Sequence, residues 1–387
     1  MAKRTLLKVN GEWKEVKNVW RNVSGEWIPK VVPKLNVSDV WKECIGYGFF
    51  YSSETPYDTD TGAIFKRDLQ GNVIKSINLS TGRFVFEMVI HVNGSLYTIE
   101  TNITNSSVQI KHYTKDLDLI ATLSCPAGYD EYHIGINKYD ILMLSYYTSA
   151  SRLCRFYNAN LSSTILKSYS VGYRYHRIEP DSDGYFYVYA NYSDASTERR
   201  LYKYWFNQET VNMEQISYVS LGNSSHVVGA MRVVEPYIII ASYSSGDQII
   251  QRRLISDLSV VVYNTTTLQG FSYSLAVDEE SLDLFTAGDG GLSTASDLYI
   301  CKTPISMATY STVFYASDFS VNDSCEDMVI MNKLLFAGYG YSAGGTQCGI
   351  VCVDLETYQK LWVKMRPNFE RFKLAIPPGI YANYLLN

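Results

Sequence analysis

Apolar and polar residues alternate in short runs along most of the chain. The clearest stretch runs from Phe84 to Ser124, where FVFEMVIHV, SLYTIET, VQIKHYT and LIATLS follow one another. Asn93-Gly94 separates the first two runs, and this dipeptide strongly favours a tight hairpin turn. Alternation with a period of two is typical of half-buried strands. The stretch therefore predicts four consecutive antiparallel strands.

The same four-strand unit recurs to the end of the chain. Turns between the first and second strands are expected 44 to 53 residues apart, near Gly94, Tyr139, Gly184, Pro236, Glu280, Lys333 and Pro378. Periods of about 40 to 50 residues built from four strands are typical of propeller blades. The sequence therefore predicts an all-β fold, a β-propeller that most simply has seven four-stranded blades.

The first blade is short of one strand in its own stretch of sequence. FFYSSE, GAIFKRD and NVIKSINL supply three strands before residue 80, and Phe372–Ile376 is a spare strand near the C-terminus. Pairing the spare strand with the first blade would close the ring and remove an exposed sheet edge. We expect this propeller to span residues 44–387. Eight blades remain possible if Val40–Cys44 is itself an inner strand.

Residues 1–43 carry a different repeat, with a period of 14. VNGEWK at 9–14 is followed by VSGEWI at 23–28 and by a degraded copy, VSDVWK, at 37–42. Each copy predicts a small hairpin with a two-residue turn. Such hairpins are barely stable alone, so their aromatic side chains need a partner surface, either the same chain or another subunit. The residues of this predicted docking arm are Trp13, Trp20, Trp27 and Trp41.

Composition and charge exclude some classes of protein. The 387 residues contain 34 Lys and Arg against 39 Asp and Glu, which argues against a nucleic-acid partner. No apolar run is long enough to span a membrane, and the first residues do not look like a signal peptide. We therefore expect no membrane insertion, and seven free, mostly buried cysteines in a chain made in a reducing cytoplasm.

Motifs that could carry catalysis are weak. Gly340–Gly344 matches the G-x-S-x-G nucleophile elbow, but no helix follows it, so we interpret it as a blade loop. His91, His133 and His176 could approach a central channel, but they lack metal-binding spacing. The carboxylate groups Asp58/Asp60, Asp181/Asp183 and Asp278/Glu279/Glu280 are interpreted as solvated turns. No catalytic residue, metal or cofactor is predicted, and the chain is expected not to be an enzyme.

Tyrosine is unusually frequent, with 33 residues. Tyr combines an apolar ring with a hydroxyl, and mixtures of Tyr, Ser, Asn and Gly suit adaptable recognition surfaces. Several Tyr residues at loop-like positions form a candidate ligand-binding surface, for which a glycan is one suitable ligand: Tyr146, Tyr147, Tyr173, Tyr175 and Tyr192. The alternative is that these side chains simply pack between blades.

Two resemblances extend this interpretation. VDLETYQKLWV and the turn DSDGYFYV resemble hairpins of quinoprotein-like propellers, and they bear on the fold rather than the function. The V-x-G-E-W-K copies resemble small Trp-containing repeats of tail-appendage proteins from tailed bacteriophages. That resemblance implies a virion protein made in the bacterial cytoplasm, whose arm docks to other phage tail proteins and which is a homo-oligomer in the tail.

The leading hypothesis is therefore a non-enzymatic tail-fibre or baseplate-peripheral protein whose propeller recognises a host cell-surface polysaccharide. Two alternatives remain open. One is an enzyme that degrades polysaccharide, for which three or more carboxylates or His should gather at one mouth of the channel. The other is a purely structural tail or collar spacer, in which the Tyr-rich loops would be buried against neighbours.

Overall fold

The computed structural model describes the backbone of six short strands before residue 44 and most of the chain after residue 47. The described residues are 6–9, 12–15, 20–23, 26–29, 34–37, 40–43, 48–56, 61–102, 104, 106–129, 131–147, 152–162, 165–171, 174–191, 198–223, 227–244, 247–266, 274–278, 281–288, 299–304, 311–315, 323–341, 348–365 and 369–376.

The first six strands form three separate two-stranded hairpins. Each strand has four residues, and two residues connect the strands of each pair. The strands are β1 (Leu6–Val9), β2 (Glu12–Glu15), β3 (Trp20–Val23), β4 (Glu26–Pro29), β5 (Lys34–Val37) and β6 (Val40–Glu43). The three hairpins share one register, because the last residue of the first strand always pairs with the first residue of the second.

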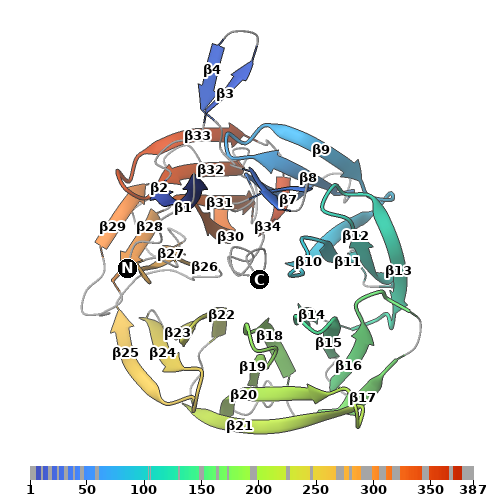
Figure 1. Cartoon of the computed structure of the whole chain (residues 1–387). Helices are drawn as coiled ribbons and strands as arrows, with labels where there is room; N and C mark the ends of the chain where they lie inside the picture. The colour runs from blue at the N-terminus through green and yellow to red at the C-terminus, as the bar shows by residue number, and fades with distance from the viewer. Residues whose placement is uncertain are drawn as a thin grey trace.

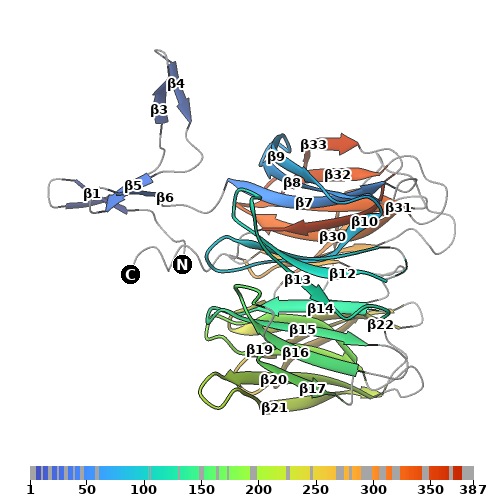
Figure 2. The ribbon, with the colours of Figure 1, turned by 90° about the vertical axis from the view of Figure 1, so that its right-hand side faces the viewer.

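The remaining strands form seven four-stranded antiparallel sheets around a central axis, a seven-bladed β-propeller (Figure 1). Within blades 2 to 7 the strands pair in sequence order, and the first strand lies innermost. In the side view, β14 to β17 lie side by side as the sheet of one blade (Figure 2). The described residues contain no helix, and thus no helix long and apolar enough to cross a membrane. The predicted all-β propeller with seven blades is confirmed.

Blades 2 to 7 each use four consecutive strands. Blades 2 to 4 comprise β10 (Arg83–Ile90), β11 (Leu96–Asn102), β12 (Val108–Tyr113), β13 (Leu119–Cys125); β14 (Glu131–Ile136), β15 (Ile141–Tyr147), β16 (Arg152–Asn158), β17 (Lys167–Ser170); β18 (Arg174–Pro180), β19 (Phe186–Asn191), β20 (Glu198–Asn207) and β21 (Asn212–Asn223). Blades 5 to 7 comprise β22 (Val227–Val234), β23 (Tyr237–Ser244), β24 (Asp247–Leu254), β25 (Val260–Thr266); β26 (Leu275–Val277), β27 (Leu284–Gly288), β28 (Tyr299–Thr303), β29 (Ser311–Tyr315); β30 (Asp323–Met331), β31 (Leu334–Tyr341), β32 (Gly349–Asp354) and β33 (Lys360–Met365).

The first blade joins the two ends of the propeller. Its strands lie in the order β34 (Phe369–Ala375), β7 (Phe49–Pro56), β8 (Ala63–Asp68) and β9 (Val73–Asn78). The C-terminal strand is thus innermost, and it pairs antiparallel with β7. The possible eighth blade is not formed, because Val40–Glu43 pairs with β5 in a hairpin while the ring closes without it.

Side-chain contacts between blade 7 and blade 1 also stabilise the closed ring. The Trp362 indole Nε1 in blade 7 donates to the carbonyl of Leu69 in blade 1 at 3.0 Å. Phe50 and Phe336 pack across the same junction, with ring centroids 4.4 Å apart. Both Phe side chains are fully buried. The junction therefore combines a fixed polar contact with a dry aromatic one.

The turns after the inner strands follow the sequence prediction. At Gly94 the backbone has φ +87° and its N–H donates to the carbonyl of His91 at 2.9 Å. In blade 4, Gly184 is also left-handed, and its N–H donates to the Asp181 carboxylate at 2.8 Å. Asp181 is therefore the acceptor of a buried turn rather than a solvated carboxylate.

Irregularities in the inner strands matter for the channel. A register shift interrupts the pairing of β10, β18, β22, β30 and β34 with the next strand. In four of these strands the residue just past the shift is charged, namely Glu87, Arg177, Asp327 and Arg371, and the structure describes the side chains of the first three. A bulge bends the strand and redirects a side chain. These bulges therefore help to place charged groups along the channel wall.

Candidate functional site in the central channel

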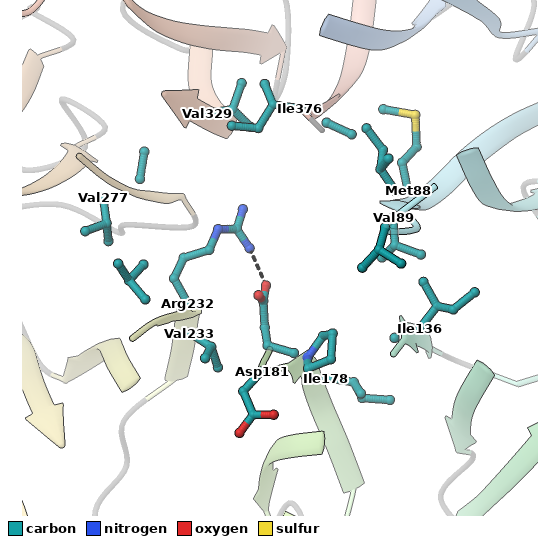
Figure 3. Close-up of a pocket in the computed structure, with 18 of the residues that line it drawn as sticks. Met88, Val89, Ile136, Ile178, Asp181, Arg232, Val233, Val277, Val329 and Ile376 are labelled. Carbon is teal, nitrogen blue, oxygen red and sulfur yellow. Dashed lines mark hydrogen bonds and ion pairs between the residues drawn. The ribbon is translucent and has the colours of Figure 1, made fainter. Parts of the chain in front are cut away.

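A cavity of about 440 Å³ occupies one part of the central channel. The inner strands of all seven blades line it, mostly with aliphatic side chains. Figure 3 shows Val89, Ile136, Val277 and Val329 around this space, with the Arg232 guanidinium reaching into it. This volume is within the range of about 300 to 1,000 Å³ that is usual for small-molecule sites.

Arg232 is the centre of an ion-pair chain inside the cavity. Its Nη1 lies 2.7 Å from Glu179 Oε1 on the neighbouring blade, and its Nη2 lies 3.8 Å from Asp327 Oδ1 two blades away in the other direction. The inner strand β26 lies between the strands of Arg232 and Asp327, and it contributes only the small side chain of Ala276 at this point of the lining. The side chains of Arg232 and Glu179 remain 32% and 25% exposed, so a ligand in the channel can reach both.

Asp327 is held firmly by the backbone. Its Oδ2 accepts the N–H of Leu374 from the next blade at 3.0 Å, and its Oδ1 accepts the N–H of Met328 at 3.0 Å. A carboxylate with two such donors has little freedom to move. Asp327 therefore adds a fixed negative charge beside Arg232.

A second charged group lies on the neighbouring wall. Glu87 Oε2 accepts the N–H of Ile134 at 3.0 Å and lies 3.3 Å from His133 Nδ1. His133 Nε2 lies 3.3 Å from Glu131 Oε2. The imidazole is thus held between two carboxylates and is nearly buried. Glu87 directly precedes Met88, which lines the cavity.

The pKa values of Glu179 and Glu87 are shifted in opposite directions by their surroundings. Burial raises the pKa of Glu179, and the Arg232 charge only partly offsets the effect. For Glu87, burial also favours the neutral acid, but the charge and hydrogen bond of His133 lower its pKa overall. Conversely, the pKa of His133 is raised, because Glu87 and Glu131 outweigh its burial. The pKa values of the two carboxyl groups are thus shifted in opposite directions.

The predicted Tyr surface does not form where the structure describes those residues. Tyr146, Tyr147 and Tyr175 are buried, with 2%, 5% and 4% of their surface exposed. The Tyr175 hydroxyl lies 2.9 Å from that of Tyr204, and such packing between strands explains the burial. These three Tyr are blade-packing residues, the alternative interpretation of the sequence. Tyr173 and Tyr192 lie outside the described residues.

The other candidate residues are placed as follows. Trp13, Trp20, Trp27 and Trp41 lie on β2, β3, β4 and β6, but their side chains are not among those described. Ser342, Asp58, Asp60, Glu279, Glu280 and the side chain of His176 also lie outside the described part. Asp278 pairs with Lys333 at 2.6 Å, and His91 Nε2 lies 3.1 Å from the Asn137 carbonyl oxygen. Within the described residues, no three potential ligands gather as a metal site would require.

The sequence interpretation missed Glu87, Glu179, Arg232 and Asp327. The available signal was a charged residue inside an apolar inner strand, as in FVFEMVIH or MRVVE. Regular alternation made such residues look like ordinary solvent-facing positions. In a propeller the innermost strand faces the channel, so its polar positions converge there.

Comparisons with known proteins identify the fold but no family. No protein-family model matches the chain, and no curated protein matches it. Among solved structures, a periplasmic gluconolactonase of Pseudomonas aeruginosa matches with a TM-score of 0.61 at 11% identity, over 85% of this chain and 100% of that one. A putative 6-phosphogluconolactonase from Bacteroides uniformis has a TM-score of 0.58 at 10% identity, over 85% and 100%.

A third similar structure is the dihydro-heme d1 dehydrogenase NirN, with a TM-score of 0.56 at 8% identity over 84% of this chain and 74% of that one. At such identities the likeness concerns the fold alone. The expectation of a non-enzymatic protein is corrected in this respect: these three propellers are named as enzymes, so a propeller fold is no reason to exclude catalysis. The absence of a contiguous catalytic motif in the sequence did not exclude an enzyme, because the charged channel residues come from separate blades.

Proposed function

We propose that the chain is an enzyme that hydrolyses a carbon–oxygen bond of a small substrate in its central channel. The proposal is carried by one observation: the paired side chains of Glu179 and Arg232 line the cavity, and Asp327 and Glu87 directly precede the lining residues Met328 and Met88 in their strands. Two carboxyl groups whose pKa values are shifted in opposite directions, Glu179 and Glu87, together with a guanidinium, are a pattern expected of an acid–base enzyme.

The pKa directions suggest a role for each group. Glu87, as the ionised base, takes a proton from water while the water oxygen bonds to the electrophilic carbon of the substrate. Arg232 stabilises the negative charge that develops on the substrate oxygen. Glu179 gives its proton to the leaving oxygen as the carbon–oxygen bond breaks. Glu87 then returns its proton to solvent, and Glu179 takes one up.

The N-terminal arm fits a separate role in attachment. The three hairpins of identical register and their resemblance to phage tail-appendage repeats support docking to other tail proteins. On this proposal the chain is a homo-oligomeric component of the virion tail, made in the host cytoplasm, and the arm carries the channel enzyme. Removing residues 1–43 should then abolish incorporation into particles and leave channel activity unchanged. Normal incorporation of the shortened chain would contradict docking by the arm.

A panel of chromogenic substrates tests the enzymatic proposal. Purified protein is assayed against 4-nitrophenyl esters and 4-nitrophenyl glycosides, and against host polysaccharide with detection of released sugars. We expect turnover of one class and a loss of about 100-fold or more in kcat in Glu179→Gln, as is typical when a general acid is removed. Glu356→Gln, which makes the same change on an exposed turn, is the control. Turnover that Glu179→Gln leaves unchanged would refute the assignment.

A further inference from the structure

We propose that the channel substrate is an acyl compound, with an aliphatic chain in the cavity and a carboxylic ester or carboxylate head at Arg232. This inference rests on the proposed channel enzyme and adds the chemical class of its substrate. It departs from the expected glycan, because the cavity has a lining suited to hydrocarbon.

The aliphatic collar is the first observation. It consists of seven residues that line the cavity and are labelled in Figure 3: Val89, Ile136, Ile178, Val233, Val277, Val329 and Ile376. Each of the seven blades supplies one member. Among the described residues that line the cavity, none is aromatic. A collar of branched aliphatic groups buries methylene groups well, but it offers a sugar ring neither a flat stacking partner nor hydroxyl partners.

The position of Arg232 gives the orientation of the ligand. Arg232, Val233, Val234 and Glu235 follow one another from the ion pair to the end of the inner strand. Polar residues Lys138, Asp181 and Ser182 also line the cavity just past the ends of β14 and β18. The Ser182 N–H donates to the Glu235 carboxylate at 2.7 Å and links two blades there. Val233 and Val234 therefore lie between a charged floor, formed by Arg232 and Glu179, and a polar rim, formed by Lys138, Asp181 and Ser182.

The floor suits an oxygen-rich head group. Arg232 carries several donors in a planar fork, and Glu179 takes up only one of its terminal nitrogens at hydrogen-bond distance. Asp327 is 3.8 Å from the other terminal nitrogen, too far for a strong hydrogen bond. A carboxylate or an ester carbonyl can therefore approach that nitrogen. The same head group would place its reacting carbon beside Glu179.

Binding of simple probes tests the inference independently of turnover. Isothermal titration calorimetry with hexanoate, octanoate, 1-octanol and gluconate is carried out on the full chain. Affinity should rise about fourfold per methylene from hexanoate to octanoate, and gluconate should bind at least tenfold more weakly than octanoate. Arg232→Met should weaken octanoate at least tenfold and leave 1-octanol within about twofold.

Two collar variants and an exposed control distinguish a loss of ligand contacts from a loss of folding. Val89→Asn and Ile376→Asn should each weaken octanoate at least about tenfold, whereas Val73→Asn, at an exposed position on β9, should not. Thermal unfolding of each variant shows whether it remains folded. Gluconate binding tighter than octanoate, or octanoate binding that both folded collar variants retain, would overturn the acyl inference.

These results separate the two proposals. Octanoate binding without turnover of any ester or glycoside would sustain the acyl ligand and refute the hydrolase. Turnover of glycosides that depends on Glu179, together with no octanoate binding, would refute the acyl class and sustain the channel enzyme.

Discussion

A buried ion pair illustrates how single residues stabilise the blades. Arg67 and Glu54 lie 2.5 Å apart with 1% and 0% of their side chains exposed. Arg67 also donates to Ser52 Oγ at 3.0 Å and to the Gly71 carbonyl at 2.9 Å. The next blade has a similar pair, Glu100 with Lys111 at 2.6 Å. The polar groups are therefore compensated, which is the condition for tolerating them in a core.

Removing one partner of the buried Arg67–Glu54 pair should lower the stability of the protein. Arg67→Met removes the guanidinium that faces the buried Glu54 carboxylate, so we expect the free energy of unfolding to fall by about 3 to 5 kcal/mol. Lys75→Met removes the exposed pair with Asp118 and should lower the free energy of unfolding far less, because solvent screens this pair. Urea unfolding measures both. Equal losses in the two variants would contradict this account, and adding Glu54→Gln to Arg67→Met should recover part of the loss.

The pair of Glu87 and His133 predicts a pH dependence of stability. The folded pKa of His133 is raised above its usual 6.5, so its stabilisation is present below that value and is lost as the pH rises through the folded pKa. The difference in unfolding free energy between the wild type and His133→Gln should therefore shrink above about pH 6.5. Urea titrations from pH 5 to 9 measure it, and a difference that grows with pH would contradict the assignment.

Residue patterns showed the fold more fully than the site. Glu87 and Arg232 could be recognised as charged residues within apolar strands, but not as neighbours of His133 or Glu179 on other blades. Their convergence depends on ring closure and on bulges, which the alternation of residues does not reveal. The Tyr prediction failed in part for a similar reason, because Tyr146 and Tyr175 lie where two sheets pack and not at loop tips.

Among the structural elements, the turns were predicted best. Gly94, Gly184 and Lys333 all lie in turns that follow inner strands, as the turn signals indicated. The register shifts within the sheets and the packing between blades could not be predicted from the sequence. The turn at Gly71 shows such a fit, because it has φ +76° and an added Cβ would lie 2.7 Å from the Trp362 ring.

This close approach gives a matched pair of substitutions. Gly71→Ala and Gly82→Ala both place Ala at a left-handed φ, which costs about 1 kcal/mol each. Only Gly71→Ala also meets Trp362, and it should lose a further 1 to 3 kcal/mol or so from overpacking. An added Cβ at Gly82 meets nothing within 4 Å. Urea unfolding compares them, and equal losses would mean that the Trp362 contact adjusts without cost.

The whole molecule depends on its C-terminal strand for closure. A chain that ends at Met365 lacks β34, which leaves the first blade with three strands and exposes the edge of β7. We expect this chain to lose cooperative unfolding and to aggregate. Unchanged cooperative unfolding without β34 would show that the remaining blades close the ring themselves.

The central claim concerns the channel, and the pH dependence of kcat/KM tests it most directly. The raised pKa of Glu179 means that its acid form is lost only above the usual value near 4.5. With the substrate that the panel identifies, wild type and Glu356→Gln should lose activity together as the pH rises through that raised pKa. Glu179→Gln should be at least about 100-fold slower and should lack this limb of the profile. A Glu179→Gln enzyme with the wild-type rate and profile would contradict acid–base catalysis by the channel residues.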